Sequence, residues 1–321
     1  MATFSIIIPV KPDGFIAALS SLRQMKAAGH SFEVLIAEGC SPSRQRNAAA
    51  NEARGEIVYF LDDDSRVTPD CLTVCAQALE DETIAVAGGP SLTPSDDSQL
   101  QQLIGCALSS LLGAGAVRNR YRAHGSARIT TEKELILCNL AMRRSAFLQS
   151  GGFDDRLYPN EENELLDRIS TSGLKLFHTP EMAIQRSQRR TLRLFARQMF
   201  SYGRGRAQQT LITGHGSIIS FAPLFFLIYL GLLPLLPCTA VSLAPLSLYG
   251  ALVVLFSAAT AVSSGKLSRL LLIPLYPLLH ICNGYGLLCG LLGGKHGRSR
   301  AGHTESAITV RRIKEFGQSA W

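Results

Sequence analysis

Acidic residues are absent from positions 215–294, and charges of either sign are rare there. Lys266 and Arg269 are the charged side chains of this stretch, which is otherwise apolar or uncharged. Proteins that carry ions or protons across a membrane use ionisable side chains within their apolar segments, so the missing acids argue against that function. A membrane transporter or scaffold protein remains an alternative interpretation, although no acidic site supports transport.

Paired cysteines are also missing. The eight cysteines form no CxxC pair and no set matched with histidines, which argues against a zinc site. Cys71 and Cys75 stand one helical turn apart and are expected to pack in a core. The N-terminal residues MATFSIIIPV carry no basic region before the apolar run, so they are expected to begin a strand instead of a signal peptide. These features favour a reducing compartment and a cytoplasmic location for the polar part of the chain.

No glycine-rich, lysine-bearing phosphate loop occurs near the N-terminus, and no internal repeat is present. A nucleotidyltransferase acting on sugar phosphates would share a Rossmann-like half and acidic residues, but we expect such a loop in it. That enzyme class is the second alternative interpretation.

The net charge of +7 is distributed unevenly. Residues 1–214 are close to neutral, with 24 Lys/Arg and 23 Asp/Glu, whereas cations flank the apolar stretch. Cations at the ends of apolar segments meet anionic lipid head groups. The charge therefore predicts membrane lipids as partners, and no nucleic acid.

Three apolar runs have the length of membrane spans: Ser217–Pro237, Ala244–Ser264 and Leu267–Leu292. A run of 21 residues is roughly 31 Å long as a helix, enough to cross the hydrocarbon core. The third run contains Pro274 and Pro277 and is expected to be kinked, tilted or re-entrant. The sequence thus predicts a domain at 1–214, a transmembrane region of two or three helices at 215–294, and a basic tail at 295–321.

The first half of the chain alternates strand-like and helix-like patterns. The expected strands are Phe4–Pro9, Phe32–Ala37, Glu56–Leu61 and Thr83–Ala87, with amphipathic or capped segments between them. This order predicts an α/β fold, a Rossmann-like domain with a mostly parallel sheet. Ligands bind such sheets beyond the carboxyl ends of the strands.

Three adjacent carboxylates, Asp62, Asp63 and Asp64, follow the third of these strands. Adjacent carboxylates repel one another, and a cation relieves that repulsion. Oxygen ligands at a strand end suit Mg²⁺ or Mn²⁺, which would in turn hold a substrate pyrophosphate. A solvated acidic turn is the alternative.

Glu161 and Glu162 begin an expected helix after the segment Gly151–Asp154. A carboxylate at a helix N-terminus is favoured electrostatically, so helix capping is one interpretation. The other is a general base that takes a proton from an attacking hydroxyl.

Seven arginines lie within 21 residues that contain no acid: Arg186, Arg189, Arg190, Arg193, Arg197, Arg204 and Arg206. They directly precede the first apolar run, which favours contact with lipid phosphates, and one or two of them could contact a diphosphate. Arg46 and Asn47, after the second strand, could reach a nucleotide or lie solvated on the surface.

Taken together, these residues resemble glycosyltransferase family 2, the inverting enzymes of the GT-A fold. The resemblance spans residues 4–210 and rests on a linked order of motifs: Phe4–Val10, Arg46–Ala49, Gly55–Asp64, Asn139–Arg144, Gly151–Asp154 and Glu161–Glu162. The apolar C-terminal part, with His280 and Gly284–Gly286, resembles membrane-bound members that build bacterial exopolysaccharides.

The resemblance implies a role for each matching residue. Pro9, Val10 and Glu38 would contact the donor nucleotide together with Arg46, Asn47, Asp62 and Asp63, while Asp62 and Asp64 would hold Mg²⁺ or Mn²⁺. Glu162 would be the catalytic base and Glu161 its neighbour, while Arg186, Arg189 and Arg190 would contact phosphate or lipid. Arg186 stands where many relatives have a histidine that helps to hold the metal.

The implied reaction moves a sugar from a nucleoside-diphosphate sugar to a lipid-linked or membrane-associated acceptor by a single in-line displacement. Arg204 and Arg206 precede the first apolar run, which predicts an inner-membrane enzyme with its catalytic domain facing the cytoplasm. The cations of the tail favour an even number of crossings, whereas the resemblance suggests three.

Overall fold

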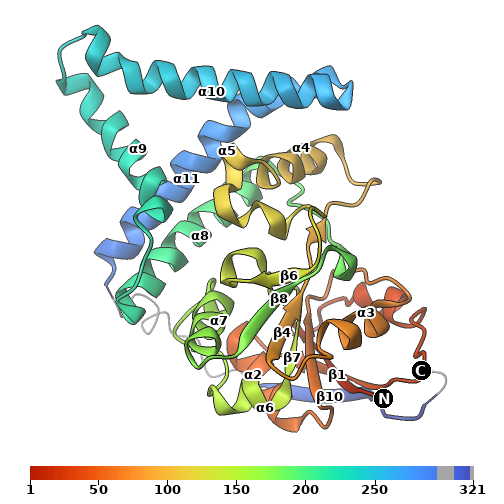
Figure 1. Ribbon diagram of the computed structural model, residues 1–321. Coiled ribbons are helices and arrows are strands. Elements are labelled where there is room, and N and C mark those ends of the chain that lie inside the picture. Colours follow the sequence, from red (N-terminus) through yellow and green to blue (C-terminus); the bar gives the residue numbers. More distant parts are fainter. Residues whose placement is uncertain (295–306, 319–321) are drawn as a thin grey trace. The chain divides into compact units, whose positions relative to one another are not determined.

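The computed structural model describes residues 1–294 and 307–318 (Figure 1). Two compact units make up these residues, and their bounds differ from the expected 1–214, 215–294 and 295–321. The first unit contains Met1–Pro94, Asn119–Ser187 and residues 307–318, and the second contains Ser95–Arg118 and residues 188–294. Residues 295–306 and 319–321 of the expected tail lie outside the described residues.

The first unit holds a sheet and its helices (Figure 1). Its strands are β1 (Thr3–Val10), β2 (Ser31–Glu38), β3 (Ile57–Leu61), β4 (Ile84–Gly88), β5 (Ser91–Leu92), β6 (Arg128–Thr130), β7 (Asn139–Arg143), β8 (Lys175–His178), β9 (Ile184–Gln185) and β10 (Thr309–Lys314). Its helices are α1 (Ala18–Leu22), α2 (Pro42–Glu52), α3 (Cys71–Ala78), α6 (Arg144–Gln149) and α7 (Glu161–Thr171).

The main sheet has the strand order β10-β2-β1-β3-β7-β4-β8-β6. Strands β1, β2, β3, β4 and β8 run in one direction, and β6, β7 and β10 run against them. The expected α/β class with a mostly parallel sheet is confirmed. Because β7 runs antiparallel between β3 and β4, its first residue, Asn139, lies opposite Leu61 at the carboxyl end of β3.

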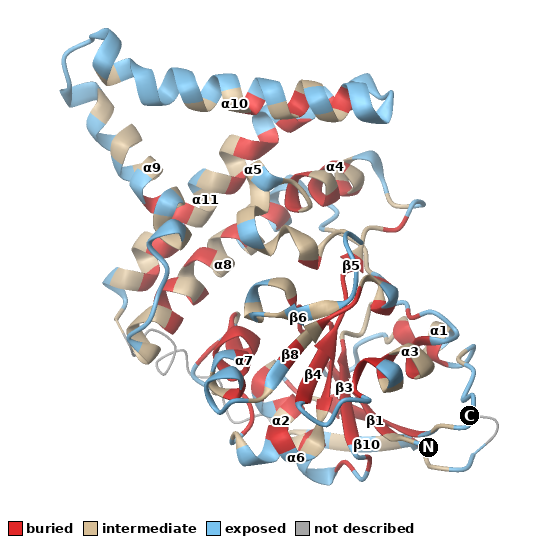
Figure 2. Cartoon of the chain, viewed as in Figure 1, coloured by how far each residue is buried: buried red, intermediate tan, exposed pale blue. Residues whose placement is uncertain are grey.

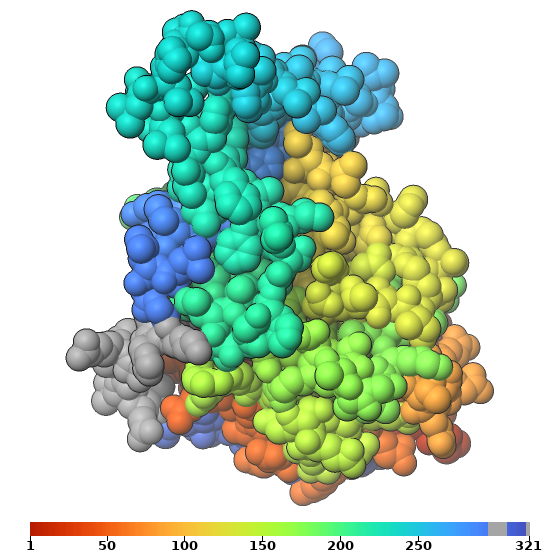
Figure 3. Space-filling model, turned by 60° about the vertical axis from the view of Figure 1, so that its left-hand side comes forward, coloured from red at the N-terminus to blue at the C-terminus, as the bar shows by residue number. Residues whose placement is uncertain are grey.

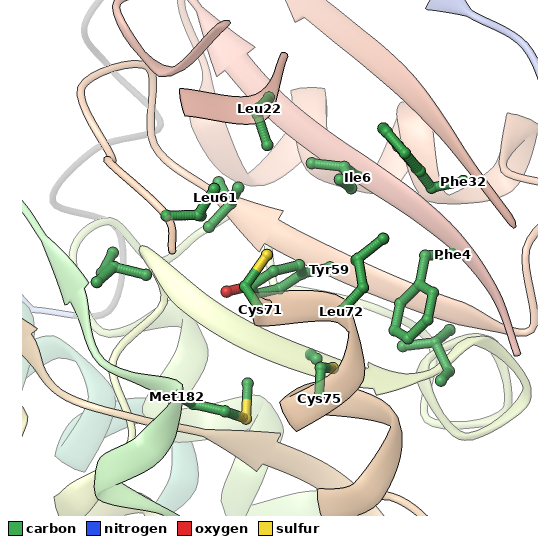
Figure 4. Packing of buried hydrophobic residues seen from close by; sticks show 14 of the residues in the cluster. Phe4, Ile6, Leu22, Phe32, Tyr59, Leu61, Cys71, Leu72, Cys75 and Met182 are labelled. Atoms are coloured by element: carbon green, nitrogen blue, oxygen red, sulfur yellow. The ribbon is translucent and has the colours of Figure 1, made fainter. Parts of the chain in front are cut away.

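The central strands are buried on both faces, as their apolar runs predict (Figure 2). On one face, Cys71, Leu72 and Cys75 of α3 pack toward Ile6 of β1 and Tyr59 of β3 (Figure 4). Burial raises the pKa of the Cys75 thiol well above its ordinary value, so this cysteine is an inert core residue. The two cysteines have the packing role that their spacing indicated.

Strand β10 lies at the edge of the sheet and pairs antiparallel with β2. Arg312 Nε lies 2.5 Å from Oε2 of Glu33, which is fully buried, and Lys314 Nζ donates to the carbonyl of Phe32 at 2.9 Å. Arg311 Nη2 lies 3.0 Å from Oε2 of Glu38. Arg312 and Arg311 pair with the two acids of β2, so part of the expected basic tail belongs to the first unit.

The second unit is helical. Its helices are α4 (Gln99–Leu108), α5 (Leu111–Ala114), α8 (Leu192–Thr213), α9 (Ala222–Leu232), α10 (Ala240–Ser264) and α11 (Leu272–Leu292). Three segments are long and apolar enough to cross a membrane: Ile218–Leu235, Ala240–Ser264 and Leu267–Leu292. A fourth candidate is the pair Gln99–Leu108 and Leu111–Arg120, which is bent by 68°.

The three long segments differ in burial (Figure 2). Only 6% and 11% of the first two apolar windows are buried, against 39% of the third. The side chains of α9 and α10, in teal and cyan, lie at the surface in the space-filling view (Figure 3). Helix α11 instead packs closely on α8, since a Cβ on Gly203 or Gly286 would lie 2.0 Å from a carbonyl oxygen of the other helix. α9 and α10 thus present more of the apolar surface that a lipid-facing helix needs than α11 does.

Candidate active site

The acidic residues occupy a tight turn directly after β3. The backbone amide of Ser65 donates to the carbonyl of Asp62 at 3.1 Å, and the Ser65 hydroxyl accepts from the Asp62 amide at the same distance. Strands β1, β2 and β4 end at this edge of the sheet as well. The turn therefore lies where α/β sheets bind their ligands.

Arg46 of α2 joins this turn to the start of α7. Its Nη2 lies 2.8 Å from Oδ1 of Asp62, and its Nη1 lies 3.3 Å from Oε1 of Glu161. The arginine is 4% exposed, so both ion pairs lie in a region of reduced solvent. One buried guanidinium thus brings together two acids that are far apart in the sequence.

Glu162 faces a different arginine. Nη1 of Arg120 lies 3.5 Å from Oε1 of Glu162, and Arg120 also donates to the Asn163 side chain. The Nε and Nη2 of Arg120 donate to the carbonyls of Lys133 and Glu132, at 2.9 and 2.5 Å, which fix the guanidinium. Sequence reasoning missed Arg120 because it follows no strand and belongs to no recognised motif.

The surroundings of Glu161 also change its pKa. Burial raises the pKa of Glu161 to about 8, the Glu162 charge adds to the rise, and Arg46 opposes it. Burial thus favours the protonated form of Glu161 and makes it a poorer proton acceptor. Burial and the neighbouring charges of Asp64 and Asp62 likewise raise the pKa of Asp63.

Among the expected donor contacts, Pro9 and Val10 lie buried at the end of β1. The Val10 carbonyl accepts from Nε2 of Gln45 at 2.8 Å, which ties β1 to α2. Glu38 lies at the end of β2, where Arg311 contacts its carboxylate. These three residues line the same edge of the sheet as the acidic turn.

Asn47 holds a loop of the first unit. Its Nδ2 donates to the carbonyl of Phe153 at 2.8 Å, and its Oδ1 accepts from the Phe153 amide at 2.9 Å. Both ends of the amide thus hold the loop that leads to α7, and Gly152 leaves room for them because a Cβ there would lie 2.7 Å from Oδ1. These contacts give Asn47 a positioning role, and the donor contact expected of it stays a prediction.

Arg186 reaches the acidic turn, where its Nη2 lies 3.1 Å from Oδ2 of Asp62 and its Nε 2.7 Å from Oδ1 of Asp64. Arg189 and Arg190 are exposed residues of the second unit, and Arg189 Nε donates to Gln198 Oε1 at 3.3 Å. A contact of these two residues with phosphate or lipid stays a prediction.

Asp62 and Asp64 are the expected metal ligands, and the side chains around them decide whether an ion fits there. No group of three or more His, Cys, Asp and Glu residues lies close enough to hold an ion within residues 1–294 and 307–318. The two aspartates are instead bridged by the guanidinium of Arg186. As they are arranged, these residues do not fit a metal held by the protein alone, and the role of Mg²⁺ or Mn²⁺ stays a prediction.

Comparisons with known proteins identify the family and the fold of the chain. The family described as "Glycosyl transferase family group 2" matches residues 57–279. The solved mannosyltransferase PcManGT from Pyrobaculum calidifontis, in complex with GDP-Man and Mn²⁺, superposes with a TM-score of 0.52 at 14% identity, covering 90% of this chain and 86% of its own. At that identity the likeness concerns the fold, which is of the GT-A type.

A curated relative is the succinoglycan biosynthesis protein ExoA of Rhizobium meliloti (strain 1021). It is 29% identical over 178 residues, which are 53% of this chain and 52% of the relative. The match thus spans about half the length of that protein.

Proposed function

Because the chain belongs to glycosyl transferase family group 2, we propose that it moves a sugar from a nucleoside-diphosphate sugar to a membrane-associated acceptor. The acceptor would carry a hydroxyl on a lipid-linked saccharide, in the synthesis of a polysaccharide or glycolipid. The name of the relative from Rhizobium meliloti supports an exopolysaccharide pathway. One observation carries the proposal: Arg46 forms ion pairs with both Asp62 and Glu161 and so holds these two acids side by side.

The proposed reaction is one displacement with inversion at the anomeric carbon. The carboxylate of Glu162 takes the proton from the acceptor hydroxyl, whose oxygen forms the new bond to that carbon. The bond to the diphosphate breaks, and the nucleoside diphosphate leaves with the electron pair. Glu161 is less suited to the same role because burial favours its protonated form.

The leaving group gains negative charge as its bond breaks, so fixed positive charge at that place lowers the barrier. Arg46 and Arg186 supply two guanidinium groups beside the acidic turn. We place the diphosphate there for this reason. Pro9, Val10 and Glu38, at the neighbouring strand ends, are the proposed contacts of the nucleoside.

The proposed location is the inner membrane, with the first unit in the cytoplasm. Arg204 and Arg206 precede the candidate span Ile218–Leu235, and Lys266 and Arg269 follow α10. Both clusters would lie on the cytoplasmic side of the membrane, as the distribution of cations in membrane proteins favours.

The test uses the purified full chain in detergent, a panel of nucleotide sugars and a total membrane lipid extract. Release of a nucleoside diphosphate that depends on both donor and extract supports the proposal, with Glu162→Gln as the inactive control. Pyrophosphate release from a nucleoside triphosphate and a sugar phosphate would indicate a nucleotidyltransferase instead. No release with any donor would contradict the proposal.

A further inference from the structure

Arg186 occupies the position at which a cation would bind the acidic turn. Its guanidinium bridges Asp62 and Asp64, and Arg46 contacts the remaining oxygen of Asp62. Three of the four carboxylate oxygens of these two aspartates are thus within ion-pair distance of a guanidinium. An arginine stays positively charged at every pH at which the protein folds, so this cation is permanent.

The backbone around Arg186 is fixed. The Gln185 amide donates to the carbonyl of Arg66 at 2.9 Å, and the Arg66 amide donates to the carbonyl of Gln185 at 2.8 Å. The amide of Arg186 donates to the Leu92 carbonyl at 2.9 Å. Since Arg66 follows Asp64 by two residues, these hydrogen bonds hold the arginine backbone next to the acidic turn. The bridging ion pairs therefore follow from the fold of this segment.

A divalent ion would meet two obstacles here. It prefers oxygen ligands without competing donors, and three oxygens of Asp62 and Asp64 already accept from guanidinium groups. It would also be repelled by the charges of Arg46 and Arg186, which lie on either side of Asp62. A histidine at position 186 would reverse both effects, because a neutral imidazole offers a lone pair and carries no charge.

We propose that Arg186 is the resident cation of the acidic turn: it keeps divalent ions out of the protein without nucleotide and presents its charge to the donor diphosphate. The first half of this proposal concerns the protein alone. The second half rests on the proposed function, because it requires that a nucleoside diphosphate binds at this edge of the sheet.

The first half is tested by Mn²⁺ binding to the purified full chain, measured from the electron paramagnetic resonance signal of free Mn²⁺ without nucleotide. We expect Arg186→His to bind Mn²⁺ at least about tenfold more tightly than the wild type. Arg186→Lys keeps the charge and should stay as weak as the wild type. Combining Arg186→His with Asp64→Asn should remove the gain, because the second carboxylate ligand is lost.

Arg186→Gln, which is neutral and closer to arginine in length, serves as a second variant if the histidine variant does not fold. Equal Mn²⁺ affinity of the wild type and the neutral variants would overturn the proposal, and so would a gain in Arg186→Lys. The second half is tested by nucleoside-diphosphate binding in EDTA, which Arg186→Gln should weaken about tenfold. An unchanged affinity there would overturn the second half alone.

These measurements are independent of sugar transfer. If no donor supports nucleoside-diphosphate release, while Mn²⁺ binding follows the expected order of the variants, the proposed function fails and the role of Arg186 as a resident cation stands.

Discussion

At the residue scale, Glu161 and Glu162 share a helix start but have different surroundings. Arg46 contacts Glu161, whose pKa burial raises, and Arg120 contacts Glu162. Glu162→Gln keeps the size of the side chain and removes its ability to accept a proton. We expect transfer to fall roughly 10²–10⁴-fold in this variant with donor affinity nearly unchanged, as steady-state kinetics and nucleotide binding would show.

Glu161→Gln is the matched control, because glutamine resembles the protonated form of Glu161 and can still accept from Arg46. Its transfer rate should fall less than that of Glu162→Gln. The opposite order of the two variants would identify Glu161 as the base.

The pKa of Glu161 also predicts how stability depends on pH. It rises from an ordinary 4.5 to about 8 in the folded protein, so the folded state holds a proton that the unfolded state releases over this range. The stabilisation is therefore fully present below pH 4.5 and is lost as pH rises to about 8. Thermal unfolding in detergent should show a melting temperature that falls across this window.

The glutamine of Glu161→Gln does not titrate, so the melting temperature of the variant should depend less on pH than that of the wild type. Relative to the wild type, the variant should therefore become more stable as pH rises. If the melting temperatures of the two proteins changed with pH in parallel, Glu161 would not titrate in this range.

At the element scale, the contact of α8 with α11 depends on glycine. A Cβ on Gly286 would lie 2.0 Å from the carbonyl oxygen of Phe200, whereas a Cβ on Gly250 of α10 meets no atom within 4 Å. We expect Gly286→Ala to destabilise the second unit by about 1–3 kcal/mol through overpacking, measured by unfolding in mixed micelles. Gly250→Ala is the control and should be neutral or slightly stabilising. Equal effects of both substitutions would mean that α8 and α11 can move apart without loss of stability.

At the scale of the whole molecule, the strand β10 constrains the path through the membrane. It pairs with β2 of the first unit, so the chain must return after α11 to the side from which it left at residue 187. The number of crossings between these points is therefore even. The same argument applies to the bent pair before Arg120, because the first unit contains both Pro94 and Asn119.

Burial distinguishes the candidate spans from one another. Helices α9 and α10 expose apolar surface, while α11 packs on α8, whose polar residues and arginines do not suit the hydrocarbon core. We predict two crossings, by α9 and α10, with α11 held at the membrane interface. This agrees with the even count that the cations of the tail favour.

Two native cysteines test this topology. Cys238, in the turn between α9 and α10, and Cys40, in the first unit, are both exposed. In intact cells a membrane-impermeant maleimide should label Cys238 and should reach Cys40 only after permeabilisation, as single-cysteine variants would show. A cysteine introduced at the exposed residue Gln318 should behave like Cys40. Labelling of position 318 in intact cells together with Cys238 would show an odd number of crossings.

Elements that depend on neighbouring residues could be predicted from the sequence. Apolar runs predicted the central strands, and the acidic turn after β3 and the glutamates at the start of α7 lie where the motifs placed them. The long apolar segments were visible for the same reason, because strand, turn and membrane-span signals depend on residues close in the chain. The segment between the first two strands is an exception to the amphipathic or capped segments expected there, since α1 covers only Ala18–Leu22 and Phe15 is exposed.

The ion pairs between residues far apart in the sequence follow from the tertiary structure alone. Arg186 lies 122 residues from Asp64, Arg120 lies 42 from Glu162, and Arg311 lies 273 from Glu38. No local pattern records such a pairing, because each arginine is as compatible with a solvated surface as with an ion pair. Arg186 and Arg311 form ion pairs because the fold places β9 next to the acidic turn and β10 at the edge of the sheet.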